Sequence, residues 1–362
     1  PLPNNDMSEV SAKQNSGCPA TAETRIFNVT AIPVEELNDT LFYNRQFNNY
    51  EMDALIFVRD EDLQKSDWEI EPLVLRANAG ECVVVNLTNS VPSDYDGSAG
   101  TYNYETDTSS TTISVDLKPS TTVGIHAELL SYDASKNDGA NVGYNPTQTA
   151  SPTGSITYEW YAGKWIDNEA VPVEFGSVVL SAPDPLEQYV KGLFGALIVE
   201  PVGSHWVEDE NSHSSATVLN ANNEVLFREF VLQFQDNLST ETDSTIHQNP
   251  NNQGDSILYN AAKYAINYKS EPMANRIAYN GGDGSDLNEN DLDSMTSNVS
   301  DGGRYPETPL LLVDKGTPVR MRLLHPGGSQ SQVINVHGHV WQEEPYINNS
   351  TELGYNDQSE WF

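Results

Sequence analysis

The stretch that decides the fold is Gln332-Val333-Ile334-Asn335-Val336-His337-Gly338-His339-Val340-Trp341. Its alternation of apolar and polar residues favours a β-strand. Because side chains repeat every two residues along a strand, His337 and His339 would share one face. Imidazole nitrogens suit a transition metal, but a buried pair of hydrogen-bonded histidines would give the same pattern. Two ligands do not make a metal site, so both interpretations stay open at this point.

This stretch resembles the copper-ligand strand of multicopper oxidases, a family of linked cupredoxin domains with the fuller pattern His-Pro-x-His-x-His-Gly-His. In that alignment Gln332 stands at the position of the type 1 histidine and Asn335 at that of the type 2 histidine. His337 matches a type 3 ligand, and His339 matches a position that is usually not a ligand. The resemblance therefore implies the cupredoxin fold with most of its copper ligands missing.

The composition restricts the partners of the chain. Among 362 residues, 53 are acidic and 18 are basic, which gives a formal net charge of −35. Nucleic acids and anionic membrane surfaces require basic patches, so neither is expected as a partner. No apolar run approaches the roughly 18 residues of a membrane span, and no signal peptide opens the sequence. We expect a soluble, secreted or cell-surface protein whose export signal has been removed.

The chain has two cysteines, Cys18 and Cys82. In an exported protein they predict one disulfide that ties the N-terminal arm to a strand. By the chain-entropy model, closing a loop of this length contributes about 4 kcal/mol to stability. The alternative is two unrelated buried thiols.

Asn-x-Ser/Thr sequons are frequent and make asparagine glycosylation a candidate modification. Chance produces several of them in a chain this rich in Asn, Ser and Thr. They lie at Asn28, Asn38, Asn86, Asn237, Asn298, Asn348 and Asn349.

Short strands with turn residues between them predict an all-β protein built from Greek-key β-sandwiches. Residues 1–24 are polar and aperiodic, which indicates an N-terminal arm. Residues 25–32 alternate as a strand does, and residues 71–87 predict two strands around a turn. Residues 91–117 are rich in Ser, Thr, Asp, Gly and Tyr, which indicates an inserted loop or hairpin.

The chain also repeats itself. His126 is followed seventeen residues later by Gly143-Tyr144-Asn145, and His337 is followed at the same distance by Gly354-Tyr355-Asn356. Both landmarks are offset by 211 positions (337 − 126 and 354 − 143). A repeat of this length predicts two copies of one domain. His126 is then the first-domain counterpart of His337, and Glu128 that of His339.

The repeat sets the expected domains: cupredoxin-like domain 1 at 25–203, a linker at 204–223 and cupredoxin-like domain 2 at 224–362. Domain 1 closes near residue 201, so domain 2 would close beyond Phe362. We therefore expect the second sandwich to lack its closing strands. Self-association or further domains would complete it by strand addition.

Other segments extend the resemblance. Residues 156–162 and 191–201 resemble multicopper oxidases, and the likeness is closest to the large manganese-oxidase-like members, to which residues 268–273 add. Residues 184–191, where copper-bearing members have histidines, contain no His or Cys, and the family's His-Cys-His motif is absent. Copper is the cofactor that the resemblance implies, and its candidate ligands here are His337, His339 and His126.

A second candidate metal site lies in the acidic segment 283–293. Alternating oxygen donors with glycine suit Ca²⁺, which takes six to eight oxygen ligands. A solvated acidic loop explains the same residues. The candidate calcium ligands are Asp283, Asp286, Asn288, Asp291 and Asp293.

Two functions are consistent with these residues. The first is an extracellular multicopper-oxidase-like protein with degenerate copper sites and a structural or assembly-forming role, as a surface or filament subunit or as the non-catalytic part of a larger oxidase. The alternative is a multicopper oxidase that oxidises metal ions or small reductants, with copper ligands shared with sequence or chains beyond this one. Whether the chain is an enzyme stays open, because function depends on the site and not on the fold.

Overall fold

The described part of the chain is all-β, as the sequence predicts. It forms twenty β-strands and two short 3₁₀ helices, η1 (Val34–Leu37) and η2 (Asp62–Gln64). Among these residues no helix is long and apolar enough to cross a membrane. The computed structural model describes residues 17–45, 49–65, 68–97, 100–105, 112–141, 143, 145–184, 187–236, 238, 241–242, 264–270, 311–328, 332–336 and 338–339.

The first sheet has the order β10 (Ser155–Tyr161), β6 (Cys82–Asn89), β1 (Thr24–Pro33) and β4 (Leu55–Arg59). β1 runs parallel to β6, while β10 and β4 are antiparallel to their neighbours. Along β6 and β10 exposed or half-exposed residues alternate with buried ones, because one face meets solvent and the other meets the core.

The second sheet has the order β5 (Leu73–Asn78), β14 (Phe194–Glu200), β13 (Gly176–Ser181) and β9 (His126–Ala127). β14 runs parallel to β5. Every residue of β5 and β14 is buried. Their near-continuous apolar sequences follow from this position, because both faces of a central sheet are covered.

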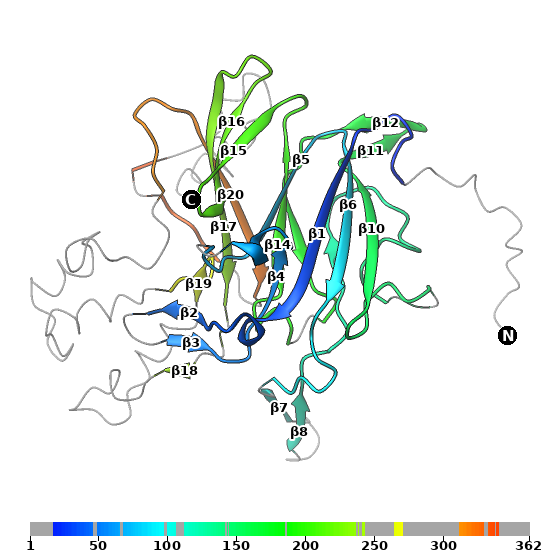
Figure 1. Cartoon of the computed structure of the whole chain (residues 1–362), viewed down its shortest axis with the longest axis vertical. Coiled ribbons are helices and arrows are strands. Elements are labelled where there is room, and N and C mark those ends of the chain that lie inside the picture. The colour runs from blue at the N-terminus through cyan, green and yellow to red at the C-terminus, as the bar shows by residue number, and fades with distance from the viewer. Residues whose placement is uncertain are drawn as a thin grey trace, which may run out of the picture. The chain divides into compact units, whose positions relative to one another are not determined.

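The first and second sheets pack face to face as one sandwich, which we call the first sandwich (Figure 1). Its core takes the inward residues of both sheets, including Val29, Phe57, Val85 and Trp160 from the first sheet and Leu75, Val178, Leu180 and Leu197 from the second. Trp160 stacks on Tyr158 with ring centroids 5.7 Å apart. This core places β9, and with it His126, at one edge of the second sheet.

The third sheet joins β15 (His205–Asp209), β16 (Ser212–Leu219), β17 (Val225–Gln235) and β19 (Ala265–Ile266), and β20 (Val319–Gly327) pairs with β17 in parallel. It packs on the outer face of the second sheet, and Figure 1 shows it across β5 and β14 from β1 and β6. The packed residues are Val74, Ala196, Ile198, Val231 and Leu324. Residues 204–223, expected to link two domains, thus carry two strands of this sheet.

The remaining strands form small hairpins. The segment predicted as an insertion, 91–117, contains the hairpin of β7 and β8, in agreement with the sequence. The strands are β2 (Leu41–Asn44), β3 (Asn49–Glu51) and β18 (Glu241–Thr242) in one sheet, β7 (Gly100–Glu105) with β8 (Thr112–Leu117), and β11 (Gly163–Ile166) with β12 (Glu169–Pro172).

The predicted disulfide is present. Cys18 and Cys82 are bonded, with their Cα atoms 5.6 Å apart. The indole Nε1 of Trp165 also donates a hydrogen bond to the carbonyl of Gly17 at 2.8 Å. The end of the N-terminal arm is therefore held against the start of β6, as the lone cysteine pair predicted.

The stretch around the paired histidines differs from the prediction. Of residues 332–341, the structure describes 332–336, 338 and 339 and assigns no strand to them. Gly338 has φ 75°, and the backbone N–H of His339 donates to the carbonyl of Val336 at 3.0 Å. Alternation favours a strand only where a partner strand pairs with it. Glycine adopts positive φ without steric cost, so the described chain turns here instead. His337 itself lies outside the described residues.

Candidate functional site

The only predicted copper ligand of the first sandwich is His126, and it lies on the short strand β9. Its Nδ1 lies 2.9 Å from the carbonyl oxygen of Asp138 and 3.4 Å from that residue's carboxylate. A carbonyl only accepts hydrogen bonds, so Nδ1 carries the proton. The ring of Tyr132 meets the imidazole edge to face, with centroids 6.4 Å apart. Burial first, and then the charge of Asp138, raise the pKa of Tyr132 to about 12.

Two glycines fix Asp138 in this place. A Cβ on Gly124 would lie 2.0 Å from the carbonyl oxygen of Gly139. A Cβ on Gly139, whose φ is 84°, would lie 1.9 Å from the carbonyl oxygen of Ile125. The loop therefore packs backbone against backbone beside β9, which only glycine permits. This packing brings the Asp138 carbonyl to His126.

The described residues do not form a copper site. A type 1 copper needs a thiolate and two histidines, and the larger clusters need several histidines together. In the described part of the chain, the one convergent group of three or more His, Cys, Asp or Glu ligands is Cys18, Cys82 and Glu159. Its two sulfurs are bonded to each other, so neither is a thiolate. These residues do not fit copper.

The other predicted site residues are only partly described. His339 is exposed, while His337 and the five candidate calcium ligands at 283–293 lie outside the described residues. Asn28 and Asn86 face each other on β1 and β6, and the Nδ2 of Asn86 donates to the Oδ1 of Asn28 at 3.0 Å. Asn38 ends η1 with φ 56°. The sequons at Asn237, Asn298, Asn348 and Asn349 lie outside the described residues.

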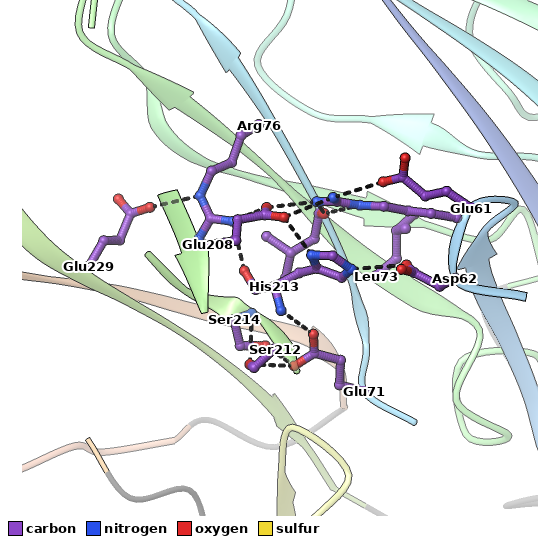
Figure 2. Close-up of polar contacts among 12 residues, drawn as sticks. Glu61, Asp62, Glu71, Leu73, Arg76, Glu208, Ser212, His213, Ser214 and Glu229 are labelled. Atoms are coloured by element: carbon purple, nitrogen blue, oxygen red, sulfur yellow. Dashed lines mark hydrogen bonds and ion pairs between the residues drawn. The ribbon is translucent and has the colours of Figure 1, made fainter. Parts of the chain in front are cut away.

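The densest polar site of the described chain joins the first sandwich to the third sheet, and we call it the charge network (Figure 2). At its centre is Arg76 of β5, whose side chain is 1% exposed. Arg76 Nε donates to Glu229 of β17 at 3.2 Å, and Nη1 donates to Glu208 of β15 at 2.7 Å. Nη1 also donates to the carbonyl of His213 of β16 at 2.7 Å. One arginine thus links three strands of the third sheet to the second sheet.

A second arginine, Arg322 of β20, shares Glu229. Arg322 Nε donates to Glu229 at 2.7 Å, and Glu200 of β14 lies 3.7 Å from both guanidinium groups. Burial and the negative charge of Glu229 raise the pKa of Glu200 to about 9. Burial also opposes ionisation of Glu229, but Arg322 and Arg76 outweigh it, so the pKa of Glu229 is lowered. Glu229 is therefore the ionised member of this carboxyl pair and Glu200 the protonated one.

His213 forms the outer part of the network. Its Nδ1 lies 2.5 Å from Glu208, and its Nε2 lies 2.9 Å from Asp62 of η2. Burial alone would lower the pKa of His213, but the hydrogen bonds to Asp62 and Glu208 raise it to about 9. Burial likewise opposes ionisation of both carboxylates. His213 together with Lys65 outweighs it at Asp62, and His213 together with Arg59 and Arg76 outweighs it at Glu208, so both pKa values are lowered.

Two more side chains complete the network. Arg59 of β4 donates to Glu208 and to the carbonyl of Val74, each at 3.0 Å. Glu71, just before β5, accepts hydrogen bonds from the hydroxyls of Ser212 and Ser214 at 2.9 Å and from the backbone N–H of His213. The hydrogen bonds of these groups run between strands, so the arrangement joins the third sheet to the first sandwich, while Arg76 Nη2 and both carboxyl oxygens of Glu200 are buried without a hydrogen-bond partner among the described residues.

The sequence analysis did not single out the charge network. The feature of the sequence that could have indicated the network is an arginine inside an apolar strand, as in Leu75-Arg76-Ala77 and Met321-Arg322-Leu323. Long charged side chains are almost never fully buried unless they are paired. That pattern indicates a buried ion pair, but it does not identify which carboxylate lies opposite.

Comparisons with known proteins match the chain at the level of structure only. No protein-family model matches it, and no curated protein does. Solved structures of multicopper oxidases are similar to it at low sequence identity. The chain spans about a third to two thirds of the length of the solved structures described next.

Three solved structures illustrate the similarity. The blue copper oxidase from Nitrosomonas europaea is 16% identical to this chain, and the match covers 88% of this chain and 65% of the oxidase chain, with a TM-score of 0.41. The multicopper oxidase mgLAC is 15% identical over 88% of this chain and 65% of its own, with a TM-score of 0.42. A multicopper oxidase from Pseudomonas thermotolerans is 14% identical over 60% of this chain and 34% of its own, with a TM-score of 0.32.

Proposed function

We propose that this chain is a secreted or cell-surface, multicopper-oxidase-like β-sandwich protein with a structural or assembly-forming role, rather than a self-contained oxidase. The observation that carries the proposal is the disulfide between Cys18 and Cys82. These are the chain's only two cysteines. A type 1 copper, which accepts the electrons in this family, needs a cysteine thiolate. The bonded pair supplies none.

The surroundings of His126 support the same proposal. Its Nδ1–H bonds to the carbonyl of Asp138, as a metal-ligating histidine would, and leaves Nε2 as the candidate ligand atom. Among the described residues no group of three or more His, Cys, Asp or Glu ligand atoms includes His126, so a copper there would lack its other protein ligands. The disulfide also suits a secreted or cell-surface location, since disulfides persist in oxidising compartments.

The assembly part of the proposal is that copies of the chain, or further domains, add strands to the third sheet. In the described chain β15 is one edge of this sheet and pairs with β16 alone. Val207 on β15 is 61% exposed. An edge strand with an exposed apolar residue is a site for strand addition. Sizing over a range of concentrations tests this part, and a strictly monomeric chain would contradict it.

The principal experiment loads the purified chain with copper, removes loosely bound metal and measures both bound copper and oxygen consumption with small reductants. We expect less than one tightly bound copper per chain and no turnover. His126→Ala is the matched control, because any copper held by the first sandwich would be lost with this imidazole. Stoichiometric copper with sustained oxygen consumption would overturn the proposal in favour of an oxidase.

A further inference from the structure

His213 connects two parts of the fold that lie far apart in the sequence (Figure 2). Its Nε2 contacts Asp62 in η2, 151 positions away, at 2.9 Å. Its Nδ1 contacts Glu208 on the other strand of its own hairpin, β15–β16, at 2.5 Å. The side chain is 13% exposed. We call these three residues the His213 bridge.

The bridge needs a protonated imidazole. Ionised carboxylates only accept hydrogen bonds, so both ring nitrogens must donate. A neutral imidazole has one N–H and one lone pair. Whichever nitrogen loses its proton, its lone pair then faces a carboxylate at hydrogen-bond distance in a buried place. One of the two bonds is replaced by repulsion.

Other charged groups face the bridge from the neighbouring elements. Glu71, just before β5, accepts a hydrogen bond from the backbone N–H of His213, and burial raises the pKa of its carboxyl. Arg59 of β4 and Arg76 of β5 contact Glu208 at 3.0 and 2.7 Å. Lys65, just after η2, contacts Asp62 at 2.7 Å but is largely solvent-exposed. These cations keep both carboxylates ionised after His213 loses its proton, so the carboxylates do not adapt by protonation. The imidazole must turn away instead.

The rest of the hairpin has a separate attachment. Glu71 binds the hydroxyls of Ser212 and Ser214, and these bonds do not involve the His213 ring. Loss of the imidazole proton therefore removes one attachment and leaves another. The expected result is local loosening of β15 and β16 without unfolding of the first sandwich.

We propose that the His213 bridge is a pH-sensitive joint that fixes the β15–β16 hairpin on the first sandwich and loosens it when the imidazole loses its proton in alkaline medium. The pH window follows from the folded-state pKa of about 9 against an unfolded value of about 6.5. The contribution of a group with a raised pKa is fully present below the unfolded value. It is lost as the pH rises through the folded value.

Hydrogen exchange tests the proposal on the whole chain. Amide exchange in β15 and β16, corrected for the intrinsic rate at each pH, is compared at pH about 6 and about 10 for the wild type and for His213→Gln. We expect the wild-type hairpin to lose about tenfold or more of its protection between these values, since one pKa unit is a factor of ten. The variant should show low protection at both.

The matched control is His205→Gln. His205 lies on the same hairpin and is half-buried, and its Nε2 contacts Asn223 at 2.9 Å. This control should keep the wild-type profile. Equal pH profiles for the wild type and His213→Gln would overturn the proposal.

A second measurement tests the proposal even if His213→Gln fails to fold. Nuclear magnetic resonance follows the titration of the His213 ring in the wild type and in Asp62→Asn. We expect a midpoint near 9 in the wild type and a lower midpoint in the variant, because one of the two acceptor carboxylates is then neutral. A wild-type midpoint near the ordinary histidine value of about 6.5 would overturn the proposal.

Discussion

At the scale of single residues, the described structure contains a few buried charges that pair with one another, although Arg76 Nη2 and both carboxyl oxygens of Glu200 lack a hydrogen-bond partner among the described residues. Arg76 is almost fully buried and contacts Glu229 and Glu208. Taking such charges out of water costs several kcal/mol each, and their mutual attraction offsets that cost only while every partner is present. The charge network is therefore sensitive to the loss of any one member.

The first prediction at this scale concerns Arg76→Met. The variant keeps an apolar stem of similar length but leaves Glu229 and Glu208 with one cation fewer in a buried place. Breaking a buried pair from one side costs about 3–5 kcal/mol. We expect a loss of this size in the free energy of unfolding, measured by urea denaturation.

Lys136→Met is the control for this prediction. Lys136 is largely exposed and lies 3.6 Å from Asp133. An exposed pair contributes about 0–1 kcal/mol. Similar losses of unfolding free energy in the two variants would contradict the prediction that the buried Arg76 contributes more to stability than an exposed ion pair does.

A second prediction concerns Glu200→Gln, which imitates the protonated carboxyl. The folded pKa of Glu200 is raised to about 9, so its contribution to stability is full below the unfolded value and is lost as the pH rises toward 9. The variant cannot ionise and should escape this loss. Urea denaturation at several pH values should show that the free energy of unfolding of the variant increases relative to that of the wild type as the pH increases. A constant difference would contradict the assignment of the proton to Glu200.

Residue-scale prediction from the sequence worked for the cysteines and not for the network. Two cysteines allow one intramolecular pairing, so the bond between Cys18 and Cys82 was predicted from the sequence, with two separate thiols as the alternative, and the structure confirms the bond. Arg76 and Glu229 are 153 positions apart, and their meeting depends on how the third sheet packs on the second. No local pattern contains that information.

At the scale of elements, the loop 131–141 is positioned by backbone contacts as well as by its side chains. Gly139 has φ 84°, and any Cβ there would collide with the carbonyl of Ile125. Gly203 has a similar φ of 72° with no atom within 4 Å of its Cβ position. Comparing alanine substitutions at the two glycines therefore separates the cost of a steric collision from the cost of a left-handed backbone conformation.

We predict that Gly139→Ala destabilises the protein more than Gly203→Ala does. A left-handed conformation costs a non-glycine residue about 1–3 kcal/mol, and the collision at Gly139 adds to that cost. The variant should also move the Asp138 carbonyl away from His126, which the chemical shift of the imidazole ring would report. Equal losses of unfolding free energy in the two variants would contradict the close packing of this loop against β9.

Elements with a partner strand were predictable, and those without one were not. Residues 25–32 form most of β1, and residues 71–87 contain β5 and most of β6 around Gly80, whose φ is 91°. The stretch 332–341 has an equally clear alternation, yet its described residues form no strand. Alternation reports which residues suit a pleated surface, whereas pairing decides whether a strand forms.

At the scale of the whole molecule, the net charge of −35 opposes folding through self-repulsion. We predict that the thermal midpoint rises when sodium chloride is increased from about 0.01 to about 1 M, since the screening length falls from about 30 to about 3 Å. The buried charge network should respond little, because buried pairs are weakly screened. The effect should shrink at pH about 4, where many carboxylates are protonated. A midpoint that falls with salt at neutral pH would contradict this prediction.

The resemblance predicted the all-β class at this scale, and the described residues confirm it. It could not predict that residues 204–223 would supply β15 and β16, because a polar segment with short alternating runs also suits a linker. The boundaries between domains stay a prediction, as do the calcium segment and the sequons outside the described residues. Functional assignment has the same limit, because a copper site depends on residues from distant segments meeting at one point.

The measurement that tests the central claim most directly is the visible and electron paramagnetic resonance spectrum of the chain after loading with copper. With both cysteines bonded to each other, no thiolate is available for a blue copper. We predict no intense blue absorption and a resonance spectrum of weakly held copper only, with no free thiols in the denatured, unreduced chain. An intense blue band with one tightly bound copper per chain would contradict the account.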